Sequence, residues 1–475
     1  MSLGPGRPPR YLSPMSDQEA NRFTARAARY ARVGANVGGV AARMGVQRLS
    51  GKSALTDANA AALAAALGGL KGPLMKVAQL MATVPDLLPP EYAAELGKLQ
   101  ANAPPMGAGF VKRRMVAELG PDWRSRFAEF DLSPAAAASL GQVHRARAPD
   151  GSRLACKLQY PDMASAVEAD LRQLQILFAL HRRLDPAIDT SEISTEIGAR
   201  VREELDYRRE AKHAKLYAHM LDGVDEVRVP RIHDDLSTGR LLSMEWLDGA
   251  PLLSFKDRGQ AVRDAIGIAM FKAWWTPFSR FGVIHGDPHL GNYSVFGEGE
   301  GINLLDYGCI RVFPPKFVGG VVDLYEGLRS GDEARVIHAY ETWGFTNLKR
   351  EVIDVLNIWA RFIYGPLLED RTRTIADGIE PGAYGRREAY RVHQELKKKG
   401  PVRVPREFVF MDRAAVGLGG VFLHLDAQLN YHRLFNEALG RFDLAGLGRQ
   451  QADALARVGL EPPAADSKTD FPRPV

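Results

Sequence analysis

The feature that most constrains this chain is a pair of polar loops, "VIHGDPHLGNYSVF" and "INLLDYGCI", which follow or end apolar segments. Asp287 and Asn292 lie in the first loop, and Asp306 ends the apolar run of the second. Mg²⁺ takes carboxylate and amide oxygens together with phosphate oxygens, and phosphoryl transfer needs a further carboxylate near the attacking hydroxyl or water. The set predicts Asp287 beside the attacking group, with Asn292 and Asp306 on a metal ion. An Asp/Asn-rich loop with capping carboxylates is the alternative, but it leaves the order of the three elements unexplained.

A lysine stands inside a third apolar segment, "RLACKLQY". Taken alone, Lys157 has the pattern of a surface residue whose aliphatic stem is buried. With the two loops downstream, it is better interpreted as a phosphate-pairing lysine, which needs a carboxylate to orient it.

The stretch "EELDYRREA" offers that carboxylate, with Glu203, Glu204, Asp206 and Glu210 as candidates. Glu204, Asp206 and Glu210 cannot all share one face of a helix, because their spacing does not match the helical repeat. This spacing indicates two separate roles for the acidic residues. A solvated acidic helix is the alternative.

The stretch "SPAAAASLGQVHRA" has the pattern of a strand, a turn and a strand that cover a nucleotide. Such turns usually contain glycine, because bare backbone must approach the phosphates closely. We interpret "AAAAS" as the phosphate-covering turn itself, with methyl groups that hold the backbone away from phosphate. Further along, "MEWLDG" ends a predicted strand, and the backbone from Glu245 to Leu247 is expected to pair with an adenine edge.

The order of predicted elements is a helical extension, a small β-rich region with inserted helices, and a larger helical region. Short apolar strands and turns run from Ala136 to Tyr160, with "PDGS" as a hairpin turn. This order predicts an α+β, bilobal fold with a ligand cleft between the lobes. The expected parts are a disordered N-terminus at 1–18, the extension at 19–106, an N-lobe at 107–247, a C-lobe at 248–460 and a disordered tail at 461–475.

Composition argues against several other classes of protein. The formal charge of +5 over 475 residues is small, and no basic stripe is interleaved with aromatic residues, so nucleic acid is not an expected partner. The two cysteines, Cys156 and Cys309, sit in apolar runs and are expected to pack in the core.

The most apolar window, "AVRDAIGIAMFKAWWTPFSRFGVI", is interrupted by charged residues and predicts a buried helix rather than a membrane span. We therefore expect a cytoplasmic protein. The segment "NRFTARAARYAR" places four arginines on about one helix face. A solvated face is the simpler interpretation, and peripheral contact with the inner face of a membrane is the other.

These motifs together resemble the UbiB/AarF-type atypical kinase-like proteins, a branch of the protein-kinase-like fold. The resemblance covers about residues 26–434. It rests on the alanine run before "LGQVHRA" and on "ACKLQYP", "ELDYRREA", "HGDPHLGN" and "DYG". It implies a protein-kinase-like fold, with ATP or ADP and Mg²⁺ as cofactors.

The resemblance also implies roles for individual residues. Lys157 would pair with Glu210 and the nucleotide phosphates, while Asp287 would occupy the catalytic-loop position. Asn292 and Asp306 would hold Mg²⁺. The nucleotide-binding residues would be Ala136, Ala137, Ala138, Ser139, Val143, Lys157, Glu245 and Leu247.

The segment "LKGPLMKVAQLMATVPDLLPPEY" resembles the family's extension, which carries Lys-x-Gly-Gln. Lys76 and Gln79 would fold over the cleft towards Glu204 and Asp206, and would partly close the place of a protein substrate. This chain departs from the pattern at Ala78, where the family usually has glycine. Alanine favours a helix by about 1 kcal/mol over glycine, but its methyl group would disturb a close backbone contact.

The resemblance implies an Mg²⁺-dependent ATPase or a small-molecule or lipid-related phosphotransferase that supports ubiquinone or other isoprenoid-lipid metabolism. Ordinary protein phosphorylation is not expected. One partner would be a nucleotide. The other would be a membrane surface, an isoprenoid lipid or quinone-biosynthesis enzymes. One alternative is a nucleotide-gated scaffold or lipid chaperone with little catalysis. Another is a small-molecule kinase of the aminoglycoside/choline type, against which "KVAQ", "AAAAS" and "ELDY" argue together.

Overall fold

A computed structural model gives the fold of this chain. It describes residues 106–463 except 139, 162, 165–166, 169–170, 172–197, 200, 346–347, 377–378, 380–384, 386–387, 389–390, 393, 396–397 and 399–405. The predicted helical extension with Lys76 and Gln79, the two predicted disordered ends (apart from the first residues of the tail) and Ser139 lie outside the described residues.

The first part of the described chain is a four-stranded antiparallel sheet in the order β1-β2-β3-β5. Its strands are β1 (Glu129–Ala138), β2 (Gly141–Arg147), β3 (Arg153–Gln159) and β5 (Leu241–Glu245). Helix α5 (Ala108–Leu119) contributes Val111 and Met115 to a core that also contains the buried Cys156. The hairpin predicted at "PDGS" is confirmed between β2 and β3, where Gly151 adopts a φ of 86°.

The alanine run does not form the turn that we expected. Ala136 pairs with Val143 and Ala138 pairs with Gly141, so the run forms the end of strand β1. Pro134 is accommodated because β1 is an edge strand with register shifts on both sides of that residue. The glycine that this hairpin requires is Gly141, where a Cβ atom would lie 2.4 Å from the Leu158 carbonyl oxygen.

The rest of the described chain is mainly helical and carries two further small sheets. Strand β4 (Val227–Arg228) runs parallel to β9 (Gly301–Leu304), in the order β4-β9-β8-β6 with β8 (Tyr293–Phe296) and β6 (Ala250–Pro251). β7 (Val283–His285) pairs with β10 (Ile310–Val312). The helices are α8 (Tyr207–Met220), α9 (Gln260–Phe281), α10 (Pro315–Ser330), α11 (Glu333–Thr342), α12 (Arg350–Leu368), α14 (Arg406–Leu425), α15 (Tyr431–Leu439) and α16 (Leu444–Arg457).

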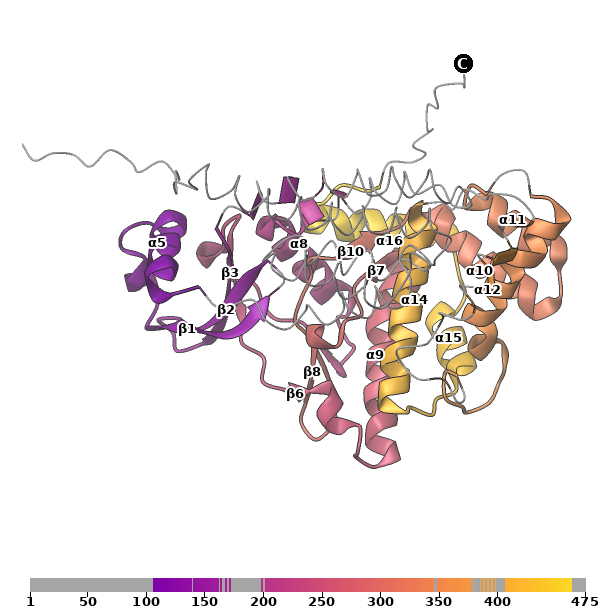
Figure 1. Cartoon of the computed structure of the whole chain (residues 1–475), viewed down its shortest axis with the longest axis horizontal. Helices are drawn as coiled ribbons and strands as arrows, with labels where there is room; N and C mark the ends of the chain where they lie inside the picture. The colour runs from indigo at the N-terminus through magenta and orange to yellow at the C-terminus, as the bar shows by residue number, and fades with distance from the viewer. Residues whose placement is uncertain are drawn as a thin grey trace, which may run out of the picture. The chain divides into compact units, whose positions relative to one another are not determined.

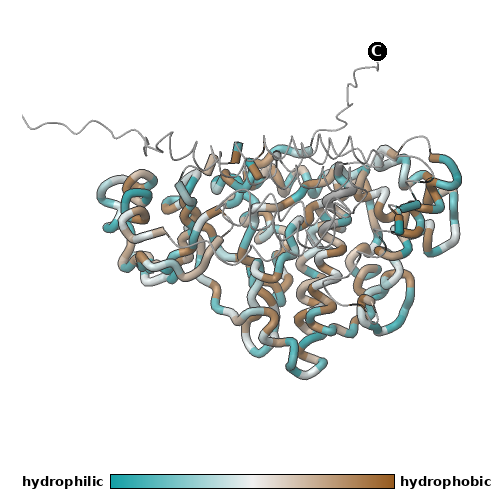
Figure 2. The backbone as a smooth tube through the Cα atoms, in the orientation of Figure 1, coloured by the Kyte–Doolittle hydropathy of each residue, from teal (hydrophilic) through white to brown (hydrophobic). Residues whose placement is uncertain are grey.

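Helix α9 is the predicted buried helix, and it lies in the large core. Phe271, Trp274 and Phe278 are buried among residues of neighbouring helices and strands. Figure 1 shows α9 and α14 side by side, and Figure 2 shows apolar residues along both of them. Among the helices that the structure describes, none has the length and apolarity needed to cross a membrane.

Helix α8 belongs to the cores of both regions. Tyr207 and Ala211 pack against Leu242 and Met244 of the first sheet, whereas Tyr217 and its neighbours lie in the large core. The fold is therefore an α+β arrangement of a small sheet-rich lobe and a larger helical lobe joined through α8.

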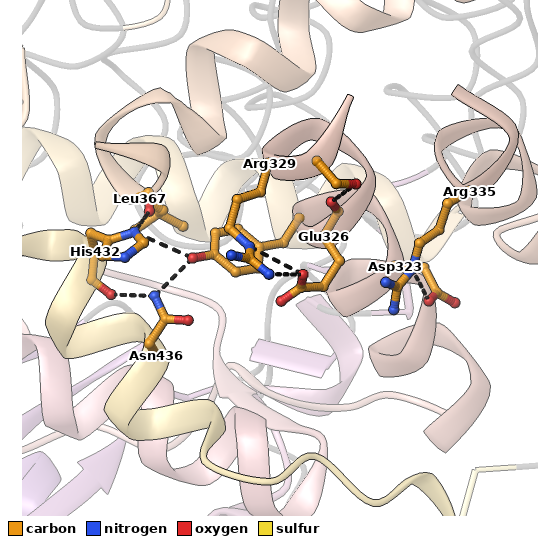
Figure 3. Close-up of polar contacts among 9 residues, drawn as sticks. Asp323, Glu326, Arg329, Arg335, Leu367, His432 and Asn436 are labelled. Carbon is orange, nitrogen blue, oxygen red and sulfur yellow. Dashed lines mark hydrogen bonds and ion pairs between the residues drawn. The ribbon is translucent and has the colours of Figure 1, made fainter. Parts of the chain in front are cut away.

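Polar contacts join helices α10, α12 and α15 of the large lobe (Figure 3). Asn436 Nδ2 on α15 donates to the Tyr325 hydroxyl on α10 over 2.8 Å. His432 Nδ1 on α15 donates to the Leu367 carbonyl of α12 over 2.7 Å. Both cysteines are buried and unbridged, as expected.

Candidate functional site

Lys157 connects three separate parts of the chain. Its Nζ atom lies 2.7 Å from Glu210 Oε1 on α8 and 2.9 Å from Asp306 Oδ2 after β9. The Lys157 side chain is only 7% exposed. The pairing of Lys157 with Glu210 that the family resemblance implied is present, and it includes Asp306 as a third member.

Three of the predicted nucleotide-binding residues form one row across the first sheet. Ala136 pairs with Val143, and Val143 pairs with Lys157, so these side chains share a face. Ala137 pairs with Gln142 and therefore lies on the opposite face. The sheet thus brings Ala136 and Val143, but not Ala137, to the side of Lys157.

The charges of this cluster shift the pKa of Lys157 and the pKa of Glu210. Burial lowers the pKa of Lys157, but the carboxylates of Asp306 and Glu210 outweigh this effect and raise it well above its usual range. Burial raises the pKa of Glu210 to about 7, although Lys157 acts in the opposite direction. Lys157 is therefore a cation at neutral pH, and Glu210 takes up or releases its proton close to neutral pH.

The raised pKa of Glu210 predicts a pH dependence of stability. As pH rises from the ordinary value of 4.5 to about 7, the unfolded chain loses this proton before the folded chain does, so the free energy of unfolding falls. Relative to Glu210→Gln, wild type should lose roughly 3 kcal/mol across this range. Urea denaturation at several pH values measures the difference, and parallel curves for the two proteins would contradict the prediction.

The acidic residues around the start of α8 have separate structural roles, as their spacing indicated. The Asp206 carboxylate caps α8 by accepting from the backbone N–H groups of Arg208 and Arg209. Glu204 and Glu210 are 9% and 3% exposed, which excludes a solvated acidic helix for these two positions. Glu204 lies beside Gly308, whose added Cβ would be 3.4 Å from Glu204 Cγ.

His285, for which the sequence predicted no role, holds the two loops together. His285 is fully buried, its Nδ1 accepts from the Asp287 backbone N–H over 3.3 Å, and its Nε2 donates to the Asp306 carbonyl over 2.7 Å. These partners require the neutral tautomer with the proton on Nε2. The only signal in the sequence was its position two residues before Asp287.

Asn292 is placed so that one atom of its amide is available to a cation. Its side-chain Nδ2 donates to the Asp287 backbone carbonyl over 3.0 Å. The backbone carbonyl of Asn292 accepts from the Leu305 N–H over 2.9 Å. The side-chain oxygen is then the atom that can bind a metal ion. Because Leu305 precedes Asp306, the backbone contact places the two predicted metal ligands at the same end of the β8–β9 hairpin.

These ligands fit Mg²⁺ held partly by phosphate. Within the described ranges no group of three or more His, Cys, Asp or Glu side chains forms a self-sufficient metal site. Mg²⁺ is commonly bound by one or two protein ligands plus substrate phosphates. Asn292 and Asp306 match that requirement.

The loop after Asp306 is anchored to α8. Tyr307 is buried, its backbone N–H lies 3.5 Å from Glu210 Oε1, and its carbonyl lies 3.1 Å from His213 Nδ1. The Tyr307 hydroxyl donates to the Leu304 carbonyl over 3.0 Å. Contacts with one helix therefore fix both Lys157 and the loop that carries Asp306.

The backbone after β5 is less available to an adenine than we expected. The N–H of Glu245 donates to the Arg231 carbonyl over 2.8 Å, and the N–H of Trp246 donates to the Arg153 carbonyl over 2.9 Å. Only the remaining backbone groups from Glu245 to Leu247 are available to pair with an adenine edge.

Comparison with known proteins identifies the class to which this fold and site belong. Residues 98–340, just over half of the chain, match the ABC1 atypical kinase-like domain. The chain therefore belongs to the ABC1 atypical kinase family, which confirms the resemblance to UbiB/AarF-type proteins.

Individual relatives are similar over parts of their length. Mitochondrial atypical kinase COQ8B of Rattus norvegicus is 27% identical over 64% of this chain and 59% of its own length. AarF domain-containing protein kinase 1 of Xenopus laevis is 30% identical over 56% of this chain and 52% of its own length. The chain thus spans a little over half the length of these relatives.

A solved structure of similar fold is that of Rv3197 from Mycobacterium tuberculosis in complex with erythromycin. It has a TM-score of 0.55 and 27% identity, and the match covers 80% of this chain and 94% of that one.

Proposed function

We propose that this protein binds ATP or ADP with Mg²⁺ and hydrolyses ATP or transfers its phosphoryl group to a small or lipid-related acceptor. The observation that carries the proposal is the buried cluster of Lys157, Glu210 and Asp306, drawn from β3, α8 and the loop after β9. A buried lysine between two carboxylates is costly to maintain, and phosphate binding gives it a function.

Each residue has a defined task in this proposal. Glu210 orients Lys157 towards the phosphates, and Asn292 and Asp306 hold Mg²⁺, which neutralises phosphate charge when it is bound. Asp287 accepts or orients the proton of the attacking hydroxyl or water. His285 fixes the relative position of Asp287 and Asp306 through its two ring nitrogens.

The acceptor is proposed from family membership. The family resemblance implies ubiquinone or other isoprenoid-lipid metabolism. It also implies that Lys76 and Gln79 fold over the cleft towards Glu204 and Asp206 and partly close the place of a protein substrate. A small or lipid-related acceptor fits that arrangement better than a protein does. Rv3197 was solved with erythromycin, which is in keeping with a small-molecule partner.

Removal of the Asp306 carboxylate tests this function. Asp306→Asn keeps the size of the side chain but removes the charge that faces the metal and Lys157, so ATP turnover should fall at least about 100-fold. The measurement is phosphate release with Mg²⁺, in the presence and absence of vesicles. Asp370→Asn changes an exposed aspartate that pairs with Arg433 and should leave turnover unchanged. Equal turnover in Asp306→Asn and wild type would refute the proposal.

A further inference from the structure

The helical lobe contains a cavity that none of the predicted site residues lines. It has a volume of about 880 Å³, its open mouth included. Residues of α9, α10, α11, α12, α14 and α15 line it, and three of the chain's six tryptophans are among them: Trp275, Trp343 and Trp359. Concave, mostly apolar sites with aromatic side chains in their walls are typical of small-molecule binding.

Three of the polar atoms in its wall make hydrogen bonds to neighbouring residues. The Tyr340 hydroxyl donates to Asn357 Oδ1 over 2.9 Å, and Trp343 Nε1 donates to the Phe317 carbonyl over 3.0 Å. The Tyr364 hydroxyl lies 3.4 Å from the Val321 carbonyl. A bound water needs two to four polar partners, so such a wall favours an apolar occupant.

The ionisable carboxyl group in this wall is that of Asp412 on α14. Its Oδ2 accepts from Trp359 Nε1 over 2.7 Å. Part of its surface remains accessible, and the residue lines the cavity. Burial raises the pKa of this carboxyl well above its usual range and so favours its protonated form. A protonated carboxyl that lines the cavity has an O–H group to donate into it.

Contacts between neighbouring helices hold the walls of the cavity in position. The Trp359–Asp412 contact ties α12 to α14. The His432–Leu367 bond in Figure 3 fixes α15 against the end of α12, and Leu367 itself lines the cavity. Trp275 packs edge-on against Phe435 of α15 with ring centroids 4.8 Å apart.

We propose that this cavity binds a lipophilic ring compound with one carbonyl oxygen, which accepts a hydrogen bond from Asp412. The aromatic walls bury the ring, and Asp412 discriminates a carbonyl compound from a hydrocarbon of the same shape. The proposal is independent of nucleotide binding, because it rests on residues of the helical lobe alone.

Two probes that differ only in the carbonyl group test the site on the full chain without nucleotide. 1-Tetralone has an aromatic ring and one ketone, and tetralin has the same ring frame without it. Titration calorimetry should show that wild type binds both, with about fivefold tighter binding of tetralone, as expected for one net hydrogen bond.

Three variants separate the contributions to binding. Asp412→Asn should keep the preference, because its amide still accepts from Trp359 and donates to the ketone. Asp412→Leu combined with Trp359→Phe removes both donors and should bind the two probes equally, and Ala415→Trp should weaken both at least about tenfold by filling the cavity. No binding to wild type, unchanged affinity in Ala415→Trp, or a preference that survives in the Asp412→Leu/Trp359→Phe variant would each overturn the proposal.

Discussion

Replacing Lys157 with methionine should lower the free energy of unfolding by about 3 kcal/mol and remove nucleotide binding. The methionine fills a similar volume, but Glu210 and Asp306 then face each other with no cation between them. Glu210 already has a pKa of about 7, so it takes up a proton in the variant. That protonation keeps the cost at the lower end of the range for a broken buried pair.

A matched control isolates the effect of burial. Lys215→Met is the same substitution in an exposed pair, because Lys215 and its partner Asp234 are 39% and 68% exposed. It should cost at most about 1 kcal/mol. Urea denaturation gives the free energies, and titration with a fluorescent ATP analogue gives the affinity.

A double variant separates the ion pair from general packing damage. Lys157→Met combined with Glu210→Gln removes both charges, so the pair should cost clearly less than the sum of the two single substitutions. Additive costs would show that Lys157 and Glu210 do not depend on each other. In that case the cluster could not carry the proposed function.

Local elements could be predicted from the sequence because their signals are local. The hairpin at "PDGS" follows from turn residues between apolar runs, and it is present. Helix α9 follows from its apolar composition between residues 260 and 281. In each case the residues that determine the element are close neighbours in the chain.

Positions that depend on register or on distant partners could not be predicted in the same way. Turn and strand residues both fit the alanine run, and only the pairing of Ala138 with Gly141 places the run in β1. Strand β4 precedes β5 in the chain, yet it pairs with β9 in another sheet.

The site shows the same division. The types of its residues were evident from the motifs, but Lys157 lies 53 positions from Glu210 and 149 from Asp306. The first of these pairings came from the family resemblance, and the second appeared only in the structure. The role of His285 was missed because it depends on two backbone contacts that no sequence pattern contains.

Gly417→Ala should reduce ATP turnover about 100-fold while nucleotide affinity stays nearly unchanged. Gly417 lies on α14, where a Cβ atom would be 2.2 Å from Pro288 Cγ. The proline ring cannot rotate away as a flexible side chain would, so the loop or the helix must move. Pro288 directly follows Asp287, and a displacement of about 1 Å at a catalytic group is enough for a loss of this size.

Gly365→Ala is the matched control for this substitution. Gly365 also lies inside a helix, α12, but a Cβ atom there would meet nothing within 4 Å. Both substitutions gain about 1 kcal/mol of helix propensity, so the difference between them isolates the contact with Pro288. Turnover and ATP affinity are measured for the two variants under the same conditions. If Gly417→Ala turns over ATP as fast as Gly365→Ala, the position of α14 does not control Asp287; if both its affinity and its turnover collapse, the disturbance extends beyond the catalytic loop to Lys157 and Glu210.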